Sequence, residues 1–410
     1  MGYQHWHFTK DKEGTAWLEI DVKDSSVNIL RVEVMQEWAE IMKEVAADSS
    51  LTGLCMVSGK PGGFVYGADI AEFNTLASEA DVHNLIALAA SVLSAIEKLD
   101  IPTVCGIDGV AVGGGLEIAL PFDRIVGVGQ RHTKLGFPEI NLGIFPGYGG
   151  TGRALRRVGI KTTLDMVLSG RLLGAEEALS HQLIDRLAED PNSLRGIMRE
   201  ELANPRNPDR VEGDAEFAAA LEAAEEDYCS SAIEAATPAP FEIIQHFKRS
   251  GGDWRKLVTS EGKAFAPLLL GEASYHLRRV FLINDAVRKT ARGDSQISHV
   301  HVIGAGTMGG DIAAVAALNG FSVSLSDREA SAVEKAVLRA ASLFERRLKT
   351  DKAIADANSR LIADVAGAHI GNADIIIEAV AERLEVKQAV FKEVEKAAKP
   401  GAILATNTSS

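Results

Sequence analysis

The chain has 410 residues, of which 46% are apolar and 24% charged, as expected for an ordinary folded protein of two or more domains. Its net charge of −14 and lack of a basic stripe argue against nucleic acid as a partner. It has no run of 18 apolar residues and no leader-like N-terminus, so we expect a cytoplasmic protein without a membrane span. Three scattered cysteines suit a reducing compartment and form no zinc spacing, so we expect no metal.

Apolar strands alternate with amphipathic helices along the first half of the chain. Short apolar or alternating runs predict strands, and apolar groups at helical spacing predict the helices between them. The expected strands are 15–21, 53–57, 103–107 and 124–128, and the expected helices are 32–46 and 85–99. This alternation favours parallel βα units and therefore an α/β fold.

The composition of the sequence changes after about residue 188. Residues 189–230 are rich in proline and acidic groups, and residues 231–292 read as helices, the last of them an amphipathic segment over 278–289. We expect the junction to the next domain at 291–298. The expected domains are 1–190, a helical extension and linker over 191–295, and 296–410.

A dinucleotide-binding pattern begins near residue 300. A strand over 300–303 leads into Gly304-x-Gly306-x-x-Gly309, an apolar helix and a second strand that ends on Asp327. Glycines at these positions let the backbone approach a pyrophosphate at the helix N-terminus, and the later carboxylate can accept ribose hydroxyls. We therefore expect NAD at this turn. The alternative is a glycine-rich turn in an unrelated α/β domain.

Three glycine-containing segments of the first half are candidates for chemistry, over residues 62–70, 108–117 and 136–151. The first two each offer a backbone N–H free of side-chain bulk, at Ala68 and Gly114, and two such donors can hold a developing oxyanion. The second and third each offer a carboxylate in apolar surroundings, Glu117 and Glu139, and such a pair can divide acid and base roles. Taken singly, each segment also reads as a tight turn or a surface Pro-Glu pair.

In this order the segments resemble the crotonase family of enoyl-CoA hydratases and isomerases, whose pattern is a G-A-D loop, a G-G-G-x-E turn and a P-E-x-x-L-G-x-x-P-G-x-G-G stretch. The resemblance covers about residues 15–190 and implies a ββα superhelix. It implies that Ala68 and Gly114 hold the thioester oxygen of a 2-trans-enoyl-CoA. It also implies that Glu117 activates water, that Glu139 protonates C2, and that the same carboxyls can shift a double bond.

Residues 300–410 are similar to the NAD domain of the 3-hydroxyacyl-CoA dehydrogenases, including the segments 375–380 and 405–410. The resemblance implies that NAD contacts Gly304, Gly306, Thr307, Met308, Gly309, Asp327, Glu378 and Ser409. A crotonase domain followed by this domain is the order of the fatty-acid oxidation complex alpha subunits. That order implies acyl-CoA substrates, β-oxidation and a thiolase beta subunit as partner.

The sequence departs from the dehydrogenase pattern in one respect. In that family a catalytic His–Glu pair follows the N-T-S-S motif, at which this chain ends, and the one histidine after Gly304 is His369, without the family context. We therefore expect a fragment with a partial Rossmann domain that cannot itself oxidise 3-hydroxyacyl-CoA. Two alternatives stay open. One is another crotonase-type isomerase, dehalogenase or hydrolase, and the other is a non-catalytic assembly subunit.

Overall fold

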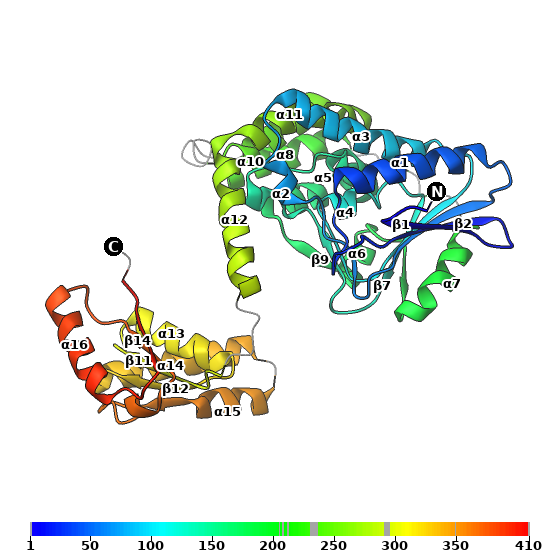
Figure 1. Cartoon of the computed structure of the whole chain (residues 1–410). Coiled ribbons are helices and arrows are strands. Elements are labelled where there is room, and N and C mark those ends of the chain that lie inside the picture. Colours follow the sequence, from blue (N-terminus) through cyan, green and yellow to red (C-terminus); the bar gives the residue numbers. More distant parts are fainter. Residues whose placement is uncertain are drawn as a thin grey trace. The chain divides into compact units, whose positions relative to one another are not determined.

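The computed structural model describes residues 2–204, 206, 209–210, 213–229, 237–290, 296–348 and 350–408. Contacts within the chain divide it into two units, residues 1–290 and 291–410, which are described separately (Figure 1). The expected junction at 291–298 lies partly outside the described residues. The finer division expected at residue 190 stays a prediction.

Unit 1 is built on a six-stranded sheet in the order β1-β2-β3-β5-β7-β10. Strand β1 pairs antiparallel with β2, and the other neighbouring strands pair in parallel. The strands are β1 (Trp6–Lys10), β2 (Thr15–Ile20), β3 (Gly53–Ser58), β5 (Thr103–Ile107), β7 (Arg124–Val128) and β10 (Arg186–Ala188). The parallel pairs confirm the predicted α/β fold, and the four predicted strands agree with the observed ones to within a residue.

A second, four-stranded sheet carries the three glycine-containing segments. Its strands, in spatial order, are β4 (Gly63–Val65), β6 (Val110–Val112), β8 (Lys134–Gly136) and β9 (Leu172–Gly174). Because β4, β6 and β8 pair in parallel, their carboxyl ends lie at one edge of the sheet. The chain leaves these ends into the loop at Ala68, the turn at Gly113 and the 3-10 helix η1 (Pro138–Leu142). The sheet therefore brings the three segments together.

Helices pack against these sheets and against one another. They are α1 (Val32–Ala47), α2 (Ile70–Phe73), α3 (Glu79–Glu97), α4 (Gly114–Glu117), α5 (Gly150–Ser169), α6 (Ala175–Ser180), α7 (Pro191–Glu201), α8 (Asp214–Tyr228), α10 (Ala239–Ser250), α11 (Trp254–Leu270) and α12 (Glu272–Thr290). The predicted start of α3 at residue 85 was wrong. The helix begins at Glu79, because Ser78 and Asp81 form a capping box that satisfies its first backbone N–H groups.

Helix α3 is the one described helix that is long and apolar enough, by length and composition, to cross a membrane. This is weak evidence for a span, because the core helix of a folded domain meets the same criteria. Its side chains Val82, Val92 and Leu93 belong to the core of unit 1, and α3 packs beside α1 and α11 (Figure 1).

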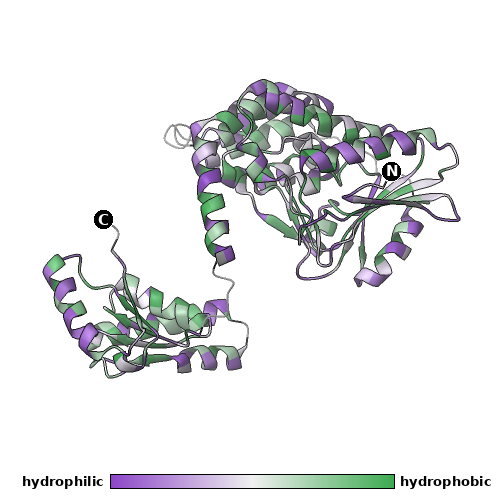
Figure 2. Cartoon of the chain, in the orientation of Figure 1, coloured by the Kyte–Doolittle hydropathy of each residue, from purple (hydrophilic) through white to green (hydrophobic). Residues whose placement is uncertain are grey.

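Unit 2 is a five-stranded parallel sheet in the order β13-β12-β11-β14-β15 with helices around it. The strands are β11 (His299–Ile303), β12 (Ser322–Ser326), β13 (Leu361–Ala363), β14 (Ile375–Glu378) and β15 (Ile403–Thr406). The helices are α13 (Thr307–Leu318), α14 (Ala330–Arg347), α15 (Asp351–Arg360), α16 (Leu384–Ala397) and the 3-10 turn η2 (Ile370–Asn372). The sheet strands are predominantly apolar, whereas the helices carry both polar and apolar residues (Figure 2).

Candidate active site

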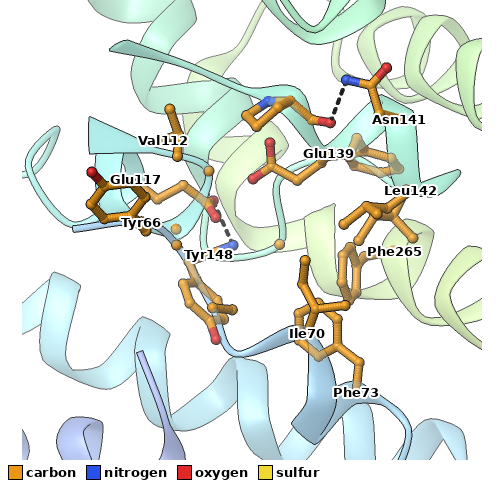
Figure 3. Close-up of a pocket in the computed structure, with 18 of the residues that line it drawn as sticks. Tyr66, Ile70, Phe73, Val112, Glu117, Glu139, Asn141, Leu142, Tyr148 and Phe265 are labelled. Carbon is orange, nitrogen blue, oxygen red and sulfur yellow. Dashed lines mark hydrogen bonds between the residues drawn. The ribbon is translucent and has the colours of Figure 1, made fainter. Parts of the chain in front are cut away.

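An apolar cavity of about 470 Å³ lies where β4, β6 and β8 end (Figure 3). Its lining includes all four residues predicted for the chemistry of unit 1: Ala68, Gly114, Glu117 and Glu139. Most of the remaining wall is apolar, with Ile70, Phe73, Leu85, Ile86, Leu142, Phe145, Phe265 and Phe281 among its residues. The site is therefore a largely apolar pocket with a few convergent polar groups, as is usual for a small-molecule site.

The backbone amides of Ala68 and Gly114 lie close together at the cavity. A Cβ atom on Gly114 would lie 3.4 Å from the Ala68 nitrogen. The loop is fixed on both sides of Ala68, because Leu30 N–H donates to the Gly67 carbonyl (2.8 Å) and Asp69 N–H donates to the Leu30 carbonyl (2.9 Å). Neither the Ala68 nor the Gly114 amide donates to a backbone carbonyl of the described chain. Two backbone donors are thus available to one acceptor atom.

Glu117, at the end of α4, is 2% exposed and hydrogen-bonded. Its Oε1 atom accepts the N–H groups of Tyr148 (2.7 Å) and Gly150 (2.8 Å). A Cβ on Gly150 would lie 2.8 Å from the Glu117 carboxylate, so this position needs a glycine. Burial raises the pKa of Glu117, while the two backbone donors favour its ionised form and oppose that shift.

Glu139, in η1, differs from Glu117 in having an oxygen without a partner. Its Oε2 atom is buried and forms no hydrogen bond with the described chain. A Cβ on Gly113 would lie 2.7 Å from Oε1, so the left-handed Gly113 makes room for this carboxyl. Burial, together with the charges of Glu117 and Glu261, raises the pKa of Glu139 well above its usual range. The two carboxyls face one another across the cavity in different environments (Figure 3).

Three residues of this region come from helices that sequence reasoning did not connect with the site. Phe265 of α11 and Phe281 of α12 line the cavity, and Glu261 of α11 reaches the turn that binds Glu117. A signal for Glu261 was present in the sequence. It stands four residues after Leu257 and four before Phe265, so it interrupts the apolar stripe of an amphipathic helix with a carboxylate.

The predicted cofactor residues of unit 2 gather at the carboxyl ends of its strands. A Cβ on Gly304 would lie 2.5 Å from the Ala379 carbonyl, whereas a Cβ on Gly306 would meet nothing within 4 Å. The open space at Gly306 lies at the N-terminus of α13, where Thr307 and Met308 form the first turn. This space fits a pyrophosphate on the helix N-terminus.

Asp327 follows β12 and lies against the same turn. Its Oδ2 atom accepts the N–H of Ala305 at 2.7 Å. Strands β12 and β14 flank β11 on opposite sides, which makes the carboxyl end of β11 the switch point of the sheet, where open α/β folds bind ligands. The residues at this end therefore fit NAD.

Glu378, at the end of β14, is fully buried and engaged by the protein itself. Its carboxylate accepts Lys387 Nζ (3.0 and 3.1 Å), Thr406 Oγ1 (2.6 Å) and Val380 N–H (2.7 Å). It anchors β14 to β15 and α16, and its predicted contact with the cofactor stays a prediction. Ser409 lies outside the described residues.

Two segments of the chain match known protein families. Residues 12–204 match the family model for enoyl-CoA hydratase/isomerase, and residues 299–410 match that for the NAD-binding domain of 3-hydroxyacyl-CoA dehydrogenase. The enoyl-CoA hydratase structure from Bacillus halodurans is 18% identical and superposes with a TM-score of 0.51, covering 67% of this chain and 99% of that chain. At this identity the likeness supports the fold alone.

Curated relatives match nearly the whole chain. The fatty acid oxidation complex subunit alpha of Shewanella halifaxensis is 32% identical over 99% of this chain and 60% of its own length. That of Pseudomonas putida is 31% identical over 97% of this chain and 58% of its own length. The chain thus spans about 60% of the length of these relatives. Residues 12–204 are similar to the enoyl-CoA hydratase/isomerase family, residues 299–410 are similar to the NAD-binding domain of 3-hydroxyacyl-CoA dehydrogenase, and the chain as a whole is similar to the fatty acid oxidation complex subunit alpha.

Proposed function

We propose that unit 1 hydrates 2-trans-enoyl-CoA to 3-hydroxyacyl-CoA, and that unit 2 binds NAD for the oxidation that follows in fatty-acid β-oxidation. The observation that carries the first activity is the pair of unlike carboxyls. Glu117 accepts hydrogen bonds from two backbone N–H groups, whereas Glu139 has a buried oxygen without a hydrogen-bond partner in the described chain. Both carboxyls face one apolar cavity. Environments that separate two carboxyls in this way assign them base and acid roles.

The geometry supports a balanced addition of water. The thioester oxygen accepts the N–H groups of Ala68 and Gly114, and negative charge moves onto it as a water oxygen bonds to C3. Glu117 takes the proton that this water loses. Glu139, whose protonated form burial favours, delivers its proton to C2, so the C2=C3 double bond is consumed. A proton then returns from Glu117 to Glu139 before the next turnover.

Replacement of either carboxyl tests this assignment. We expect Glu117→Gln and Glu139→Gln each to lower kcat for crotonyl-CoA hydration by roughly 10²–10⁴-fold, the typical cost of losing one positioned acid or base. The control is Glu176→Gln, at an exposed position of α6. Hydration by both variants at the wild-type rate would remove the carboxyls from the mechanism.

The products formed from crotonyl-CoA separate the rival activities. A hydratase forms 3-hydroxybutyryl-CoA with no free thiol, whereas a thioester hydrolase releases the CoA thiol. An isomerase moves a proton between C2 and C4 of a 3-enoyl-CoA, which the same two carboxyls can also carry out as a side activity. A non-catalytic assembly subunit turns over none of these substrates.

We propose further that the chain acts in the cytoplasm beside a thiolase subunit. The support is the resemblance to subunits of a fatty acid oxidation complex. Co-expression with a candidate thiolase followed by size-exclusion chromatography tests the partner, and fractionation of the native cell tests the compartment.

A further inference from the structure

Glu261 is a carboxylate in the interior of unit 1 that the mechanism above does not use. It lies on α11 and is 0% exposed. Within the described part of the chain, its hydrogen bonds all go to one short turn at the start of α5. Oε1 accepts the N–H groups of Gly149 (2.6 Å) and Gly150 (3.2 Å), and Oε2 accepts the N–H of Thr151 (3.1 Å) and its hydroxyl.

The same turn binds the Glu117 carboxylate. Tyr148 and Gly150 donate their N–H groups to Glu117, and the Gly150 N–H is shared between Glu117 and Glu261. The carbonyl side of the turn is also fixed, because Arg153 Nη1 donates to the Tyr148 carbonyl (2.7 Å) while Nη2 pairs with Glu97 of α3 (2.9 Å). The turn is therefore held from α3 and α11, while the N–H groups of Tyr148 and Gly150 donate to Glu117.

A buried carboxylate is costly unless its oxygens are satisfied, so Glu261 and the turn constrain one another. If Glu261 is lost, the amides of Gly149 and Thr151 lose their acceptor inside the protein. These two amides can then reach another acceptor only if the turn moves. Burial and the charge of Glu117 raise the pKa of Glu261, while the hydrogen bonds from the Thr151 hydroxyl and from the N–H groups of Gly149 and Thr151 oppose that shift. The ionisable groups that interact electrostatically with Glu117 include Glu139, Glu261 and Arg153.

We propose that Glu261 is a positioning residue of the hydratase site, which holds the 148–151 turn so that its amides keep the Glu117 carboxylate aimed into the cavity. This role rests on the hydration proposed for unit 1. It assigns a function to α11, which lies outside the segment that matches the hydratase family model. Glu261 acts through Glu117 and does not touch the substrate.

A double-mutant cycle tests this role. We expect Glu261→Gln to lower kcat for crotonyl-CoA by about 10-fold to 10²-fold with KM within about twofold, because small displacements of a catalytic group cost rate more than binding. In the Glu117→Gln background the same change should cost little further rate, since residues that act as a unit are not additive. Full additivity of the two losses would overturn the proposal.

Three further variants separate a loss of positioning from a loss of folding. Thr151→Val removes one of the four donors to Glu261 and should lower kcat less than Glu261→Gln does. Thr151→Ser keeps the hydroxyl and should have the wild-type kcat. Lys263→Gln, at an exposed position two residues from Glu261 on α11, should leave kcat unchanged. Circular dichroism accompanies each variant. Equal rates for Thr151→Val and Thr151→Ser would count against the proposal.

A measurement without turnover separates this proposal from the proposed function. Amide hydrogen exchange at Tyr148 reports the hydrogen bond to Glu117 directly, and exchange at Gly150 reports the N–H that Glu117 and Glu261 share. In Glu261→Gln we expect exchange at least about 10-fold faster at these two amides, with β5 unchanged. If the wild-type chain fails to hydrate crotonyl-CoA, the proposed function falls, and the exchange rates still decide whether Glu261 holds the turn. Unchanged exchange would overturn the proposal.

Discussion

At the scale of single residues, the site depends on two glycines that make room for two carboxyls. Gly113 leaves space for Glu139, and Gly150 leaves space for Glu117 while donating its N–H to it. In the proposed hydration, each glycine acts through the carboxyl next to it. The glycine-rich turns therefore make room for the carboxyls as well as changing the direction of the chain.

Gly150→Ala tests this dependence. Its Cβ would lie 2.8 Å from Glu117, so we expect the carboxylate to move and kcat to fall by about 10²-fold. The matched control is Gly196→Ala on the exposed face of α7, where a Cβ meets nothing within 4 Å. That change should keep activity and raise stability by roughly 0.4–1 kcal/mol. Equal activity of the two variants would contradict the argument.

Asp327 predicts NAD over NADP in unit 2. Its carboxylate lies against the glycine turn, where it can accept ribose hydroxyls and repel a 2′-phosphate. The neighbouring Arg328 works against this preference. Fluorescence titration should give a lower Kd for NADH than for NADPH, and Asp327→Asn should narrow the difference. Tighter binding of NADPH to the wild-type chain would reverse the assignment.

At the scale of elements, the strand β11 carries a buried histidine in the middle of its sheet. His301 is 0% exposed, and its ring nitrogens lie 2.7 and 3.0 Å from the hydroxyls of Ser324 and Ser326 on β12. Burial lowers the pKa of His301 to about 4, while Asp364 opposes that shift. The sheet therefore folds around a neutral imidazole.

This histidine makes the stability of unit 2 depend on pH. The unfolded chain binds a proton near the ordinary pKa of histidine and the folded chain does so only near pH 4, so stability is complete above about pH 6.5 and falls as the pH drops towards 4. The loss is on the order of 3 kcal/mol at most. Hydrogen exchange of β11 amides across this range measures it. His301→Asn should flatten the dependence, whereas replacement of the exposed His83 should not.

At the scale of the whole molecule, each unit has hydrophobic clusters of its own. The buried clusters of unit 1 draw on residues up to Leu269, and those of unit 2 on residues from Val300 onwards. A compact unit with its own core can unfold as a cooperative whole.

We therefore expect two unfolding transitions in calorimetry. NADH at about 100 times its Kd should stabilise unit 2 alone, by about 2.7 kcal/mol, because a ligand stabilises the state that binds it. Gly306→Asp, which fills the open space at the cofactor turn, should abolish the shift. The transition of unit 1, identified by loss of hydratase activity, should not move. A single transition that NADH shifts as a whole would show that the units unfold together.

The sequence by itself determined the features that depend on local chemistry. These features are the strand–helix alternation, the dinucleotide turn and the segments bearing Glu117 and Glu139. Each depends on residues that are close together in the sequence, so hydrophobic periodicity and the positions of glycines suffice to predict it. Only the tertiary structure decided that β4, β6 and β8 bring those segments to one edge, and that Glu139 keeps an oxygen without a partner. It also decided that Glu261, 110 residues beyond Thr151, reaches the turn behind Glu117. Whether a buried polar group finds a hydrogen-bond partner depends on which elements pack together, and the local sequence does not specify this packing.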